Sequence, residues 1–304
     1  MIQFRGVTKE FKGNVVLSDI SMDINDGELT VLIGPSGCGK TTTLKMINRL
    51  IPASKGEIFI DEKNIEEMDK VQLRRNMGYV IQQGGLFPHM TIRQNIEIIE
   101  RLEKKDTEKI VENTKQLMKM VDLDPDQFLD RYPTELSGGQ RQRIGIARAL
   151  AAEPEFIVCD EPISALDVSI QAQVINILEE LQDKFHFTYL FISHDLSMVR
   201  HISSEVGVMY LGSLIEYARV DELYDNMLHP YTQSLISAVP VADPKLAKEN
   251  KRIILEGDVP SPINPAPGCP FRSRCRYAKD ICSQAKPELK AVNDKHKVAC
   301  HLFD

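Results

Sequence analysis

One segment of the chain has the residue types and the spacing of a loop that holds nucleotide phosphates. This phosphate loop (residues 34–41) reads Gly34-Pro35-Ser36-Gly37-Cys38-Gly39-Lys40-Thr41. Its glycines let the backbone turn N–H groups inward, and a helix that begins there adds the positive end of its dipole. Lys40 can neutralise the β- and γ-phosphates, and the Thr41 hydroxyl can ligate Mg²⁺. The segment predicts binding of ATP or GTP, with a chance match in a glycine-rich turn as the alternative.

Acidic and imidazole side chains follow two apolar runs further along the chain. Residues 156–159 are continuously apolar and are followed by Asp160 and Glu161. Ligands of open α/β sheets bind at the carboxyl ends of such strands. There Asp160 can hold Mg²⁺ through water, and Glu161 can orient or deprotonate an attacking water. His194 follows the next apolar run, residues 189–192, and can reach a γ-phosphate. Two solvated acids and a structural histidine are the alternatives.

Two further features suit a nucleotide. The signature segment, residues 136–140, contains Ser137, Gly138, Gly139 and Gln140 and opens a helix that runs to residue 150. Ser137 is a good N-cap and the glycines expose N–H groups, so this is either a second anion site or only a capped helix start. Phe11 lies between two charged residues. Its ring can stack on adenine or pack on the core, and the sequence does not separate the two.

The elements that must position these residues follow from periodicity. Residues 29–33 predict a buried strand that enters the phosphate loop, and residues 42–47 predict the helix that leaves it. Short strands are expected in residues 1–30 and 56–60. From residue 91 to about 129 the pattern is helical, with an apolar stripe at Ile92, Ile96, Ile99 and Leu102. The fold class expected is α/β, with a mainly parallel core sheet, antiparallel strands and a helical insertion.

Composition limits the possible partners. The formal net charge of -7 leaves no basic excess for a nucleic acid partner. No apolar run approaches the length that spans a bilayer, and the first residues do not begin a secretory signal. We therefore expect a cytoplasmic protein that a partner holds at a membrane if it works there.

Together these motifs resemble the ATP-binding cassette (ABC) family, the ATPase subunits of ABC transporters. The resemblance covers roughly residues 1–235. Its motifs are a Walker A loop at residues 34–42 that includes Thr42, the signature segment, a Walker B strand at residues 156–161, a D-loop at residues 164–167, the Q-loop glutamine Gln82, the switch histidine His194 and the aromatic A-loop position Phe11. The family implies a P-loop NTPase fold, ATP with Mg²⁺ as ligands, and Thr41, Gln82 and Asp160 around the metal.

The resemblance also implies partners. ABC ATPases form head-to-tail dimers, in which each ATP lies between one subunit's Walker A loop and the other's signature. The second subunit can be a copy or a paralogue. Transmembrane permease subunits dock near the Q-loop and the helical insertion, here residues 82–135. An importer also uses an external substrate-binding protein, and the ATPase lies at the cytoplasmic face of the membrane. A soluble ABC ATPase and a P-loop kinase are the rival functions; the single cassette and the signature segment disfavour them.

The finer resemblance is split. Residues 41–50, 78–83 and 86–92 look like importers of quaternary amines such as glycine betaine, choline or carnitine. From about residue 141, the segments 160–171 and 229–232 look like oligopeptide and dipeptide importers. The transported substrate is therefore predicted to be either a quaternary amine osmoprotectant or a peptide.

The end of the chain needs its own explanation. Residues 240–268 are rich in proline, as a linker would be, and Cys269, Cys275, Cys282 and Cys300 follow. Zinc is one possible ligand of the four thiols, although paired C-x-x-C spacing is missing, and four reduced cysteines without metal are another reading. The tail resembles the C-terminal extension of peptide-importer cassettes, some of which hold a [4Fe–4S] cluster on four such cysteines, and all four positions match. The domains expected are residues 1–238, with a helical subdomain at about 84–140, and an extension at residues 239–304.

Overall fold

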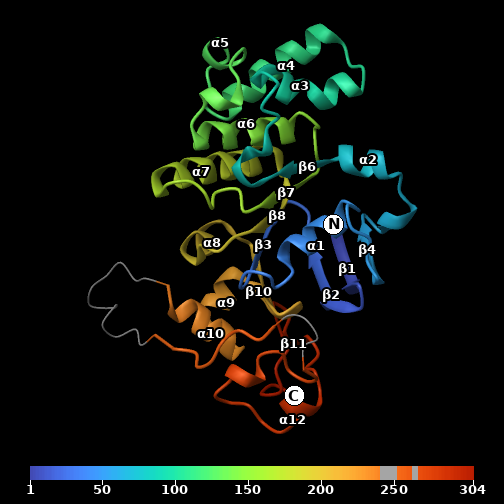
Figure 1. Ribbon diagram of the computed structural model, residues 1–304, viewed down its shortest axis with the longest axis vertical. Helices are drawn as coiled ribbons and strands as arrows, with labels where there is room; N and C mark the ends of the chain where they lie inside the picture. The colour runs from blue at the N-terminus through green and yellow to red at the C-terminus, as the bar shows by residue number, and fades with distance from the viewer. Residues whose placement is uncertain (240–251, 262–265) are drawn as a thin grey trace. The chain divides into compact units, whose positions relative to one another are not determined.

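The computed structural model describes residues 1–239, 252–261 and 266–304 (Figure 1). Pro240, Pro244, Pro262 and Pro265 of the predicted linker lie outside these residues. The chain divides into two compact units. Unit 1 comprises Met1–Ile24, Thr30–Ile65 and Ser193–Asp304, and unit 2 comprises Asn25–Leu29 and Glu66–Ile192. The boundary expected near residue 238 stays a prediction.

Unit 1 contains an antiparallel sheet of four strands. The strands are β1 (Ile2–Phe11), β2 (Asn14–Ile24), β4 (Lys55–Ile60) and β5 (Lys63–Asn64), in the order β2-β1-β4-β5. Alternate residues of β1, such as Ile2 and Phe4, are buried, as expected for strands with one face on the core. This sheet confirms the antiparallel strands expected from the sequence.

A second group of strands in unit 1 supports the phosphate loop. It contains β3 (Leu29–Ile33), β9 (Glu205–Tyr210), β10 (Ser213–Arg219), β11 (Lys290–Asn293) and β12 (His296–Val298), in the order β11-β12-β10-β9-β3. β3 pairs with β9 in parallel, and the other neighbours are antiparallel. The helices are α1 (Lys40–Ile47), α8 (Leu196–Ile202), α9 (Val220–Asp225) and α10 (Pro230–Ser237).

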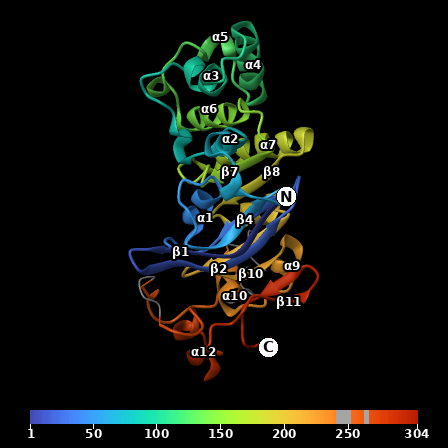
Figure 2. The ribbon, with the colours of Figure 1, turned by 90° about the vertical axis from the view of Figure 1, so that its right-hand side faces the viewer.

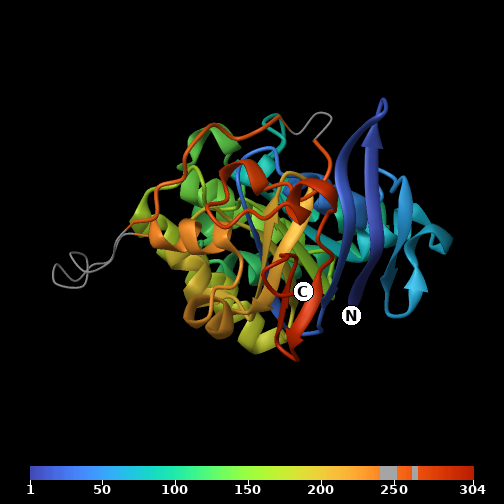
Figure 3. The same cartoon turned by 90° about the horizontal axis from the view of Figure 1, so that it is seen from below.

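The end of the chain therefore extends this sheet. Figure 3 shows the hairpin of β11 and β12 in red beside β10. Two short helices, η4 (Arg272–Arg274) and α12 (Ile281–Gln284), precede the hairpin. Phe271 is almost fully buried and packs against Tyr210 and Tyr231, at centroid separations of 5.3 and 5.5 Å. The residues after 251, called the extension below, thus contribute core and sheet to unit 1.

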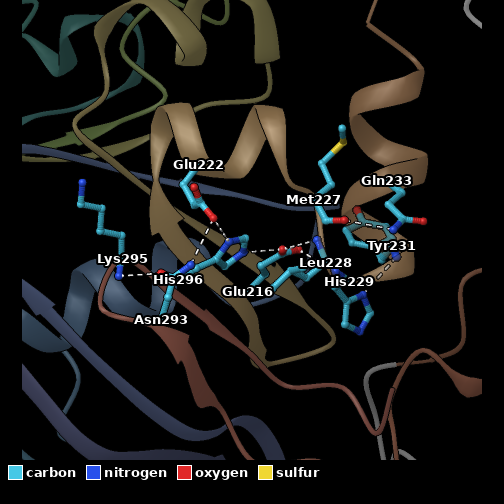
Figure 4. A network of polar contacts seen from close by, with 10 residues as sticks. All are labelled: Glu216, Glu222, Met227, Leu228, His229, Tyr231, Gln233, Asn293, Lys295 and His296. Atoms are coloured by element: carbon cyan, nitrogen blue, oxygen red, sulfur yellow. Dashed lines mark hydrogen bonds and ion pairs between the residues drawn. The ribbon is translucent and has the colours of Figure 1, made fainter. Parts of the chain in front are cut away.

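A buried polar network joins the extension to the residues after β10 (Figure 4). Glu216 of β10 accepts hydrogen bonds from the N–H groups of Leu228 and His229, at 2.7 and 3.1 Å. Nε2 of His296 in β12 lies 2.7 Å from the same carboxylate. The Glu216 and His296 side chains are fully buried. A buried carboxylate needs such partners because its charge has lost the stabilisation of water.

Unit 2 is built on three parallel strands. They are β6 (Met77–Val80), β7 (Phe156–Asp160) and β8 (Thr188–Ile192), with β7 in the middle. Every residue of β8 and the first four of β7 are buried, as the continuous apolar runs predict. The longer helices α6 (Gly138–Leu150) and α7 (Val168–Phe185) accompany the strands, and η1 (Ile65–Glu67) and α2 (Lys70–Arg75) precede β6.

The helical insertion of unit 2 lies between β6 and α6. It contains η2 (Gln82–Gly85), α3 (Ile92–Leu102), α4 (Thr107–Met120), α5 (Pro125–Phe128) and η3 (Pro133–Glu135). Figure 2 shows α3, α4 and α5 grouped next to α6. Thr91 caps α3 in a capping box with Gln94, and Asp106 caps α4.

The inward face of α3 differs from the predicted stripe. Ile92 and Ile96 are buried as expected, but Leu102 is 62% exposed, and Glu100 is buried instead. Burial raises the pKa of Glu100, and the carboxylate accepts a hydrogen bond from Asn113. The prediction was wrong for Leu102. The buried position is Glu100, whose carboxylate finds a hydrogen-bond partner, Asn113, on α4. Helical periodicity within α3 does not reveal such a partner.

Candidate nucleotide site

At two glycines of the phosphate loop, neighbouring strands leave no room for a side chain. Gly34 has φ +148°, and a Cβ there would lie 2.2 Å from the carbonyl oxygen of Met209. Gly39 has φ +105°, and a Cβ there would lie 2.3 Å from Cδ2 of Leu17. These contacts are shorter than atoms tolerate. A backbone carbonyl of β9 and a side chain of β2 therefore pack directly against the loop at these two glycines. The loop is held in shape by the strands that support it.

The Lys40 ammonium is hydrogen-bonded to the backbone of the phosphate loop. Its Nζ donates to the carbonyl oxygens of Gly34 and Pro35, at 2.8 and 3.0 Å. The side chain is 5% exposed. Helix α1 begins at Lys40 with the left-handed residue Gly39 as N-cap, so its first N–H groups and its dipole face the loop. A buried cation at a helix N-terminus fits a phosphate group in this loop.

Phe11 lies at the end of β1, and its ring is 41% exposed. The ammonium of Lys9 lies 4.8 Å from the ring centroid. The structure therefore does not place this ring in the core, which was one of the two readings of the sequence. An exposed aromatic ring is the condition for stacking on a base.

His194 is exposed and belongs to unit 1, together with the phosphate loop. The preceding Ser193 donates its N–H to the carbonyl of Leu32 in β3, at 3.4 Å. Asp195, the next residue, caps helix α8. His194 thus lies between two residues held by hydrogen bonds, and the first of them, Ser193, is bonded to β3, the strand that leads into the phosphate loop.

The carboxyl end of β7 presents the two acids in unit 2. The hydroxyl of Tyr79 in β6 lies 3.5 Å from Oδ2 of Asp160, and burial together with this carboxylate raises the pKa of Tyr79. Glu161 has φ +51°, a left-handed backbone that a non-glycine residue adopts at a cost of about 1 kcal/mol or more. The strained turn directs the chain away from the strand immediately after Asp160.

Gln82 is linked to the same turn. Its Nε2 donates to Oγ of Ser164 at 2.9 Å, and this hydroxyl donates to the carbonyl of Glu161 at 3.1 Å. The Q-loop glutamine, the D-loop serine and the residue predicted as the general base therefore form one hydrogen-bonded chain within unit 2. The sequence placed these residues in separate motifs and did not predict the connection.

The signature segment begins helix α6 as predicted. Oγ of Ser137 accepts from the N–H of Gln140 at 3.3 Å, and Oε1 of Gln140 accepts from the N–H of Ser137 at 2.9 Å. Gly139 packs against α7, since a Cβ there would lie 2.4 Å from Cγ2 of Ile170. Gly139 is therefore required by its close packing against α7.

The predicted site residues are divided between the two units. Phe11, the phosphate loop and His194 belong to unit 1, and Gln82, the signature segment, Asp160 and Glu161 belong to unit 2. Sequence reasoning missed Tyr79, which contacts Asp160, and Arg148, which contacts the backbone next to Gln82. Both are ordinary residues of a strand or helix in the sequence, and only their long-range partners distinguish them.

The four C-terminal cysteines lie in one neighbourhood of unit 1 as free thiols. Burial raises the pKa of Cys269 to about 11, and the other three thiols add to the shift. In the parts of the chain that the structure describes, however, no three histidine, cysteine, aspartate or glutamate side chains form a group that could hold a metal ion. The arrangement of Cys269, Cys275, Cys282 and Cys300 therefore gives no support to the expected zinc ion or [4Fe–4S] cluster.

None of the helices within the described ranges is long and apolar enough to cross a bilayer. This agrees with the absence of a long apolar run in the sequence.

Comparison with known proteins extends the resemblance to the whole chain. Residues 17–164 match the model of the ABC transporter family, and residues 215–282 match that of the oligopeptide/dipeptide transporter C-terminal region. The oligopeptide transport ATP-binding protein AppF of Bacillus subtilis is 47% identical over 98% of this chain and 93% of its own length. The oligopeptide transport ATP-binding protein OppF of Haemophilus influenzae is 44% identical over 93% of this chain and 87% of its own length.

These relatives correct the finer resemblance. They align with the first half of the chain as well as the second, and they give no support to the quaternary-amine resemblance of the first half. The split pattern came from short segments near the phosphate loop and the Q-loop. Those segments include Thr41 and Gln82, which are predicted nucleotide-site residues, so they carry little information about the transported solute.

Solved structures agree with the family. The ATP-binding cassette MJ0796, solved as a dimer bound to ADP and Pi, superimposes with a TM-score of 0.67 at 29% identity, over 72% of this chain and 99% of that chain. The cbiO1 protein of Clostridium perfringens, part of an ABC transporter complex, gives a TM-score of 0.69 at 26% identity, over 74% of this chain and 90% of its own. With its phosphate loop, its signature helix and relatives that match almost from end to end, the chain belongs to the ATP-binding subunits of ABC transporters, which couple ATP hydrolysis to transport.

Proposed function

We propose that the chain is the ATP-hydrolysing subunit of an importer of oligopeptides or dipeptides. The observation that carries this substrate class is the match of residues 215–282 to the C-terminal region of oligopeptide/dipeptide transporters. That region begins in β10 and includes Phe271, so its described residues contribute to the core of unit 1. The names of the relatives, which refer to oligopeptide or peptide transport, support the same class.

The phosphate loop would bind the triphosphate of ATP. Lys40 would exchange its two carbonyl partners for β- and γ-phosphate oxygens, a stronger charge-assisted interaction. Mg²⁺, which Thr41, Gln82 and Asp160 would hold, neutralises the charge that develops on the transferred phosphoryl group. Phe11 would stack on the base.

Glu161 would act as the general base on the attacking water, and His194 would contact the γ-phosphate. The signature segment of a second ABC ATPase subunit, arranged head to tail, would complete the site with the N–H groups of Gly138 and Gly139. Ser137 caps that helix and would add its hydroxyl. Because two incomplete halves share one phosphate chain, ATP would close the dimer, and hydrolysis would release it.

An apolar groove in unit 2 is suited to a permease subunit. The groove is a cavity of about 340 Å³ next to the Gln82 loop, with basic and apolar side chains along it. Its apolar wall includes Ile81 and Phe87, which are exposed, and Leu102. An apolar surface with a basic rim fits an amphipathic segment of a partner at the cytoplasmic face of the membrane. An external substrate-binding protein would deliver the peptide to that permease.

The catalytic assignment is tested with Glu161→Gln, which keeps the size of the side chain and removes the base. We expect ATP binding to remain, ATP-dependent dimers to accumulate in size-exclusion chromatography, and the hydrolysis rate to fall by about a hundredfold or more. Glu180→Gln, the same change at an exposed position of α7, should behave like the wild type. A Glu161→Gln protein that remains monomeric and still turns over ATP would contradict the mechanism.

The substrate class is tested by uptake in a strain that lacks the gene. Labelled di- and tripeptides and labelled glycine betaine are compared, and the gene with Glu161→Gln serves as the complementation control. We expect peptide uptake to be lost and betaine uptake to be kept. Loss of betaine uptake alone would overturn the peptide assignment while leaving the ATPase assignment intact.

A further inference from the structure

We propose that Arg148 is a positioning residue that fixes the Gln82 segment, residues 82–85, to the signature helix α6. Nη1 of Arg148 donates to the carbonyl oxygen of Gly85 at 2.9 Å, and Nη2 donates to that of Gly84 at 2.8 Å. The planar guanidinium thus spans two consecutive carbonyl groups. A lysine cannot present the same pair of separate donor nitrogens, because its charge is carried by one ammonium nitrogen. Burial lowers the pKa of Arg148, which remains a cation.

The glycines of this region bring the two backbones into direct contact. Gly84 has φ +75°, and a Cβ there would lie 2.4 Å from the carbonyl oxygen of Arg141 in α6. A Cβ on Gly145 would lie 2.9 Å from Cα of Gly84. Nε2 of Gln142 also reaches the carbonyl of Ile81, at 3.4 Å. The segment therefore lies on the helix without intervening side chains, and Arg148 holds it there from one side.

The other end of the segment faces the D-loop. Gln82 donates to Ser164, and a Cβ on Gly138, at the start of α6, would lie 3.3 Å from Cδ2 of Leu166. The segment thus has at its first residue the side chain proposed to hold Mg²⁺, and it is attached to α6 two and three residues later. Gln82 cannot change its backbone position without breaking the Arg148 hydrogen bonds or moving α6.

This inference rests on the proposed contact of Gln82 with the Mg²⁺–ATP complex. It adds that Arg148, which touches neither nucleotide nor metal in that scheme, transmits the position of Gln82 to the helix that carries the signature segment. Loss of Arg148 would leave Gln82 free to move independently of α6. Nucleotide binding would persist, and the closed, hydrolysing arrangement would form less often.

The test is a double-mutant cycle between Gln82→Ala and Arg148→Lys, measured as kcat and KM for ATP in the transporter purified with its permease subunits. We expect each single change to lower kcat by about tenfold with KM changed less than about threefold. In the Gln82→Ala background, Arg148→Lys should lower kcat by less than about twofold further. A purely structural role for Arg148 would reduce kcat by the same factor in both backgrounds, and this result would overturn the proposal.

Two further variants keep the test decisive. Gly145→Ala disturbs the same contact from the helix side and should reproduce the kcat loss with Arg148 intact, so it replaces Arg148→Lys if that protein does not fold. Arg143→Lys is the matched control, because Arg143 lies on α6 but donates to the carbonyl of Asp122 and to Gln173. It should leave kcat within about twofold of the wild-type value.

If Gln82→Ala itself leaves kcat unchanged, the proposed role of Gln82 fails together with this inference. If Gln82→Ala lowers kcat but Arg148→Lys lowers kcat by the same factor in both backgrounds, only this inference fails.

Discussion

At the scale of single residues, the phosphate loop shows two different reasons for a glycine. Gly37 and Gly39 both have positive φ, of +76° and +105°. A Cβ on Gly37 would meet no atom of the described residues within 4 Å, whereas a Cβ on Gly39 would lie 2.3 Å from the Leu17 side chain. Gly37 is therefore required by backbone conformation alone, and Gly39 by conformation and space together.

We expect Gly39→Ala to destabilise the protein more than Gly37→Ala. The left-handed backbone costs an alanine about 1 kcal/mol at either position. Only at Gly39 must the Leu17 side chain also move, which adds about 1–3 kcal/mol of overpacking. Chemical denaturation without nucleotide measures the difference. Equal losses of stability in the two variants would contradict the close contact with Leu17.

A buried histidine predicts how stability depends on pH. Burial lowers the pKa of His229 to about 4, against the opposing effect of Glu216, while the ordinary value is 6.5. Between these values the unfolded chain binds a proton that the folded chain excludes. Stability should therefore fall as the pH drops from about 6.5 to about 4, with about 3 kcal/mol from this residue.

The control for the pH dependence is His229→Asn. Nδ1 of His229 accepts from the N–H of Tyr231 and caps α10, and asparagine can make the same cap. Urea unfolding at several pH values should show a smaller loss of stability in the variant between pH 6.5 and 4. An unchanged slope would show that His229 does not carry the effect.

At the scale of elements, helix α3 presents an apolar side chain that the core does not use. Leu102 is mostly exposed and lines the groove proposed for the permease, next to Ile98 and Ile99. Burial of such a leucine in a partner interface would contribute about 1.5–3 kcal/mol. Its exposure in the single subunit is therefore consistent with docking.

We expect Leu102→Glu to weaken attachment to the permease subunits by at least tenfold, because a charge would enter an apolar contact. Co-purification from membranes and nucleotide binding by the purified chain are the two measurements. Nucleotide binding should be unchanged. Val71→Glu is the control, since Val71 is an exposed residue of α2 that does not line the groove. Equal attachment of the Leu102 and Val71 variants would argue against this groove as the docking site.

At the scale of the whole molecule, the extension behaves as part of unit 1. Phe271 packs on Tyr210, Tyr231 and His229, and β12 pairs with β10. The match to the peptide-transporter C-terminal region begins within β10 and ends in the extension, at residue 282. The matched region thus crosses the boundary that the sequence suggested near residue 238.

We expect Phe271→Ala to cost about 3–5 kcal/mol of stability, the usual loss for a large buried side chain. Tyr277→Ala is the control, because Tyr277 lies in the same extension but is exposed. Thermal unfolding of the full chain would measure both. A Phe271→Ala protein as stable as Tyr277→Ala would show that the extension is a loosely attached appendage.

The sequence by itself determined the features that depend on neighbours along the chain. The phosphate loop, the signature helix with its Ser137 cap, and the buried strands β7 and β8 follow from local spacing, because caps, turns and periodicity act over a few residues. These motifs were sufficient to predict the α/β fold and the family. The peptide substrate class was only one of two predicted options, because short segments in the first half of the chain resembled quaternary-amine importers and segments in the second half resembled peptide importers.

Only the tertiary structure decided features that join distant residues. It exposed Phe11 and Leu102, paired β12 with β10, and placed the Arg148 guanidinium on the backbone beside Gln82. It also showed that the four thiols, although gathered together, do not form a group that could hold a metal ion within the described ranges. Each outcome depends on which surfaces meet after the chain has folded, and a contact across sixty or more residues leaves no periodic trace in the sequence.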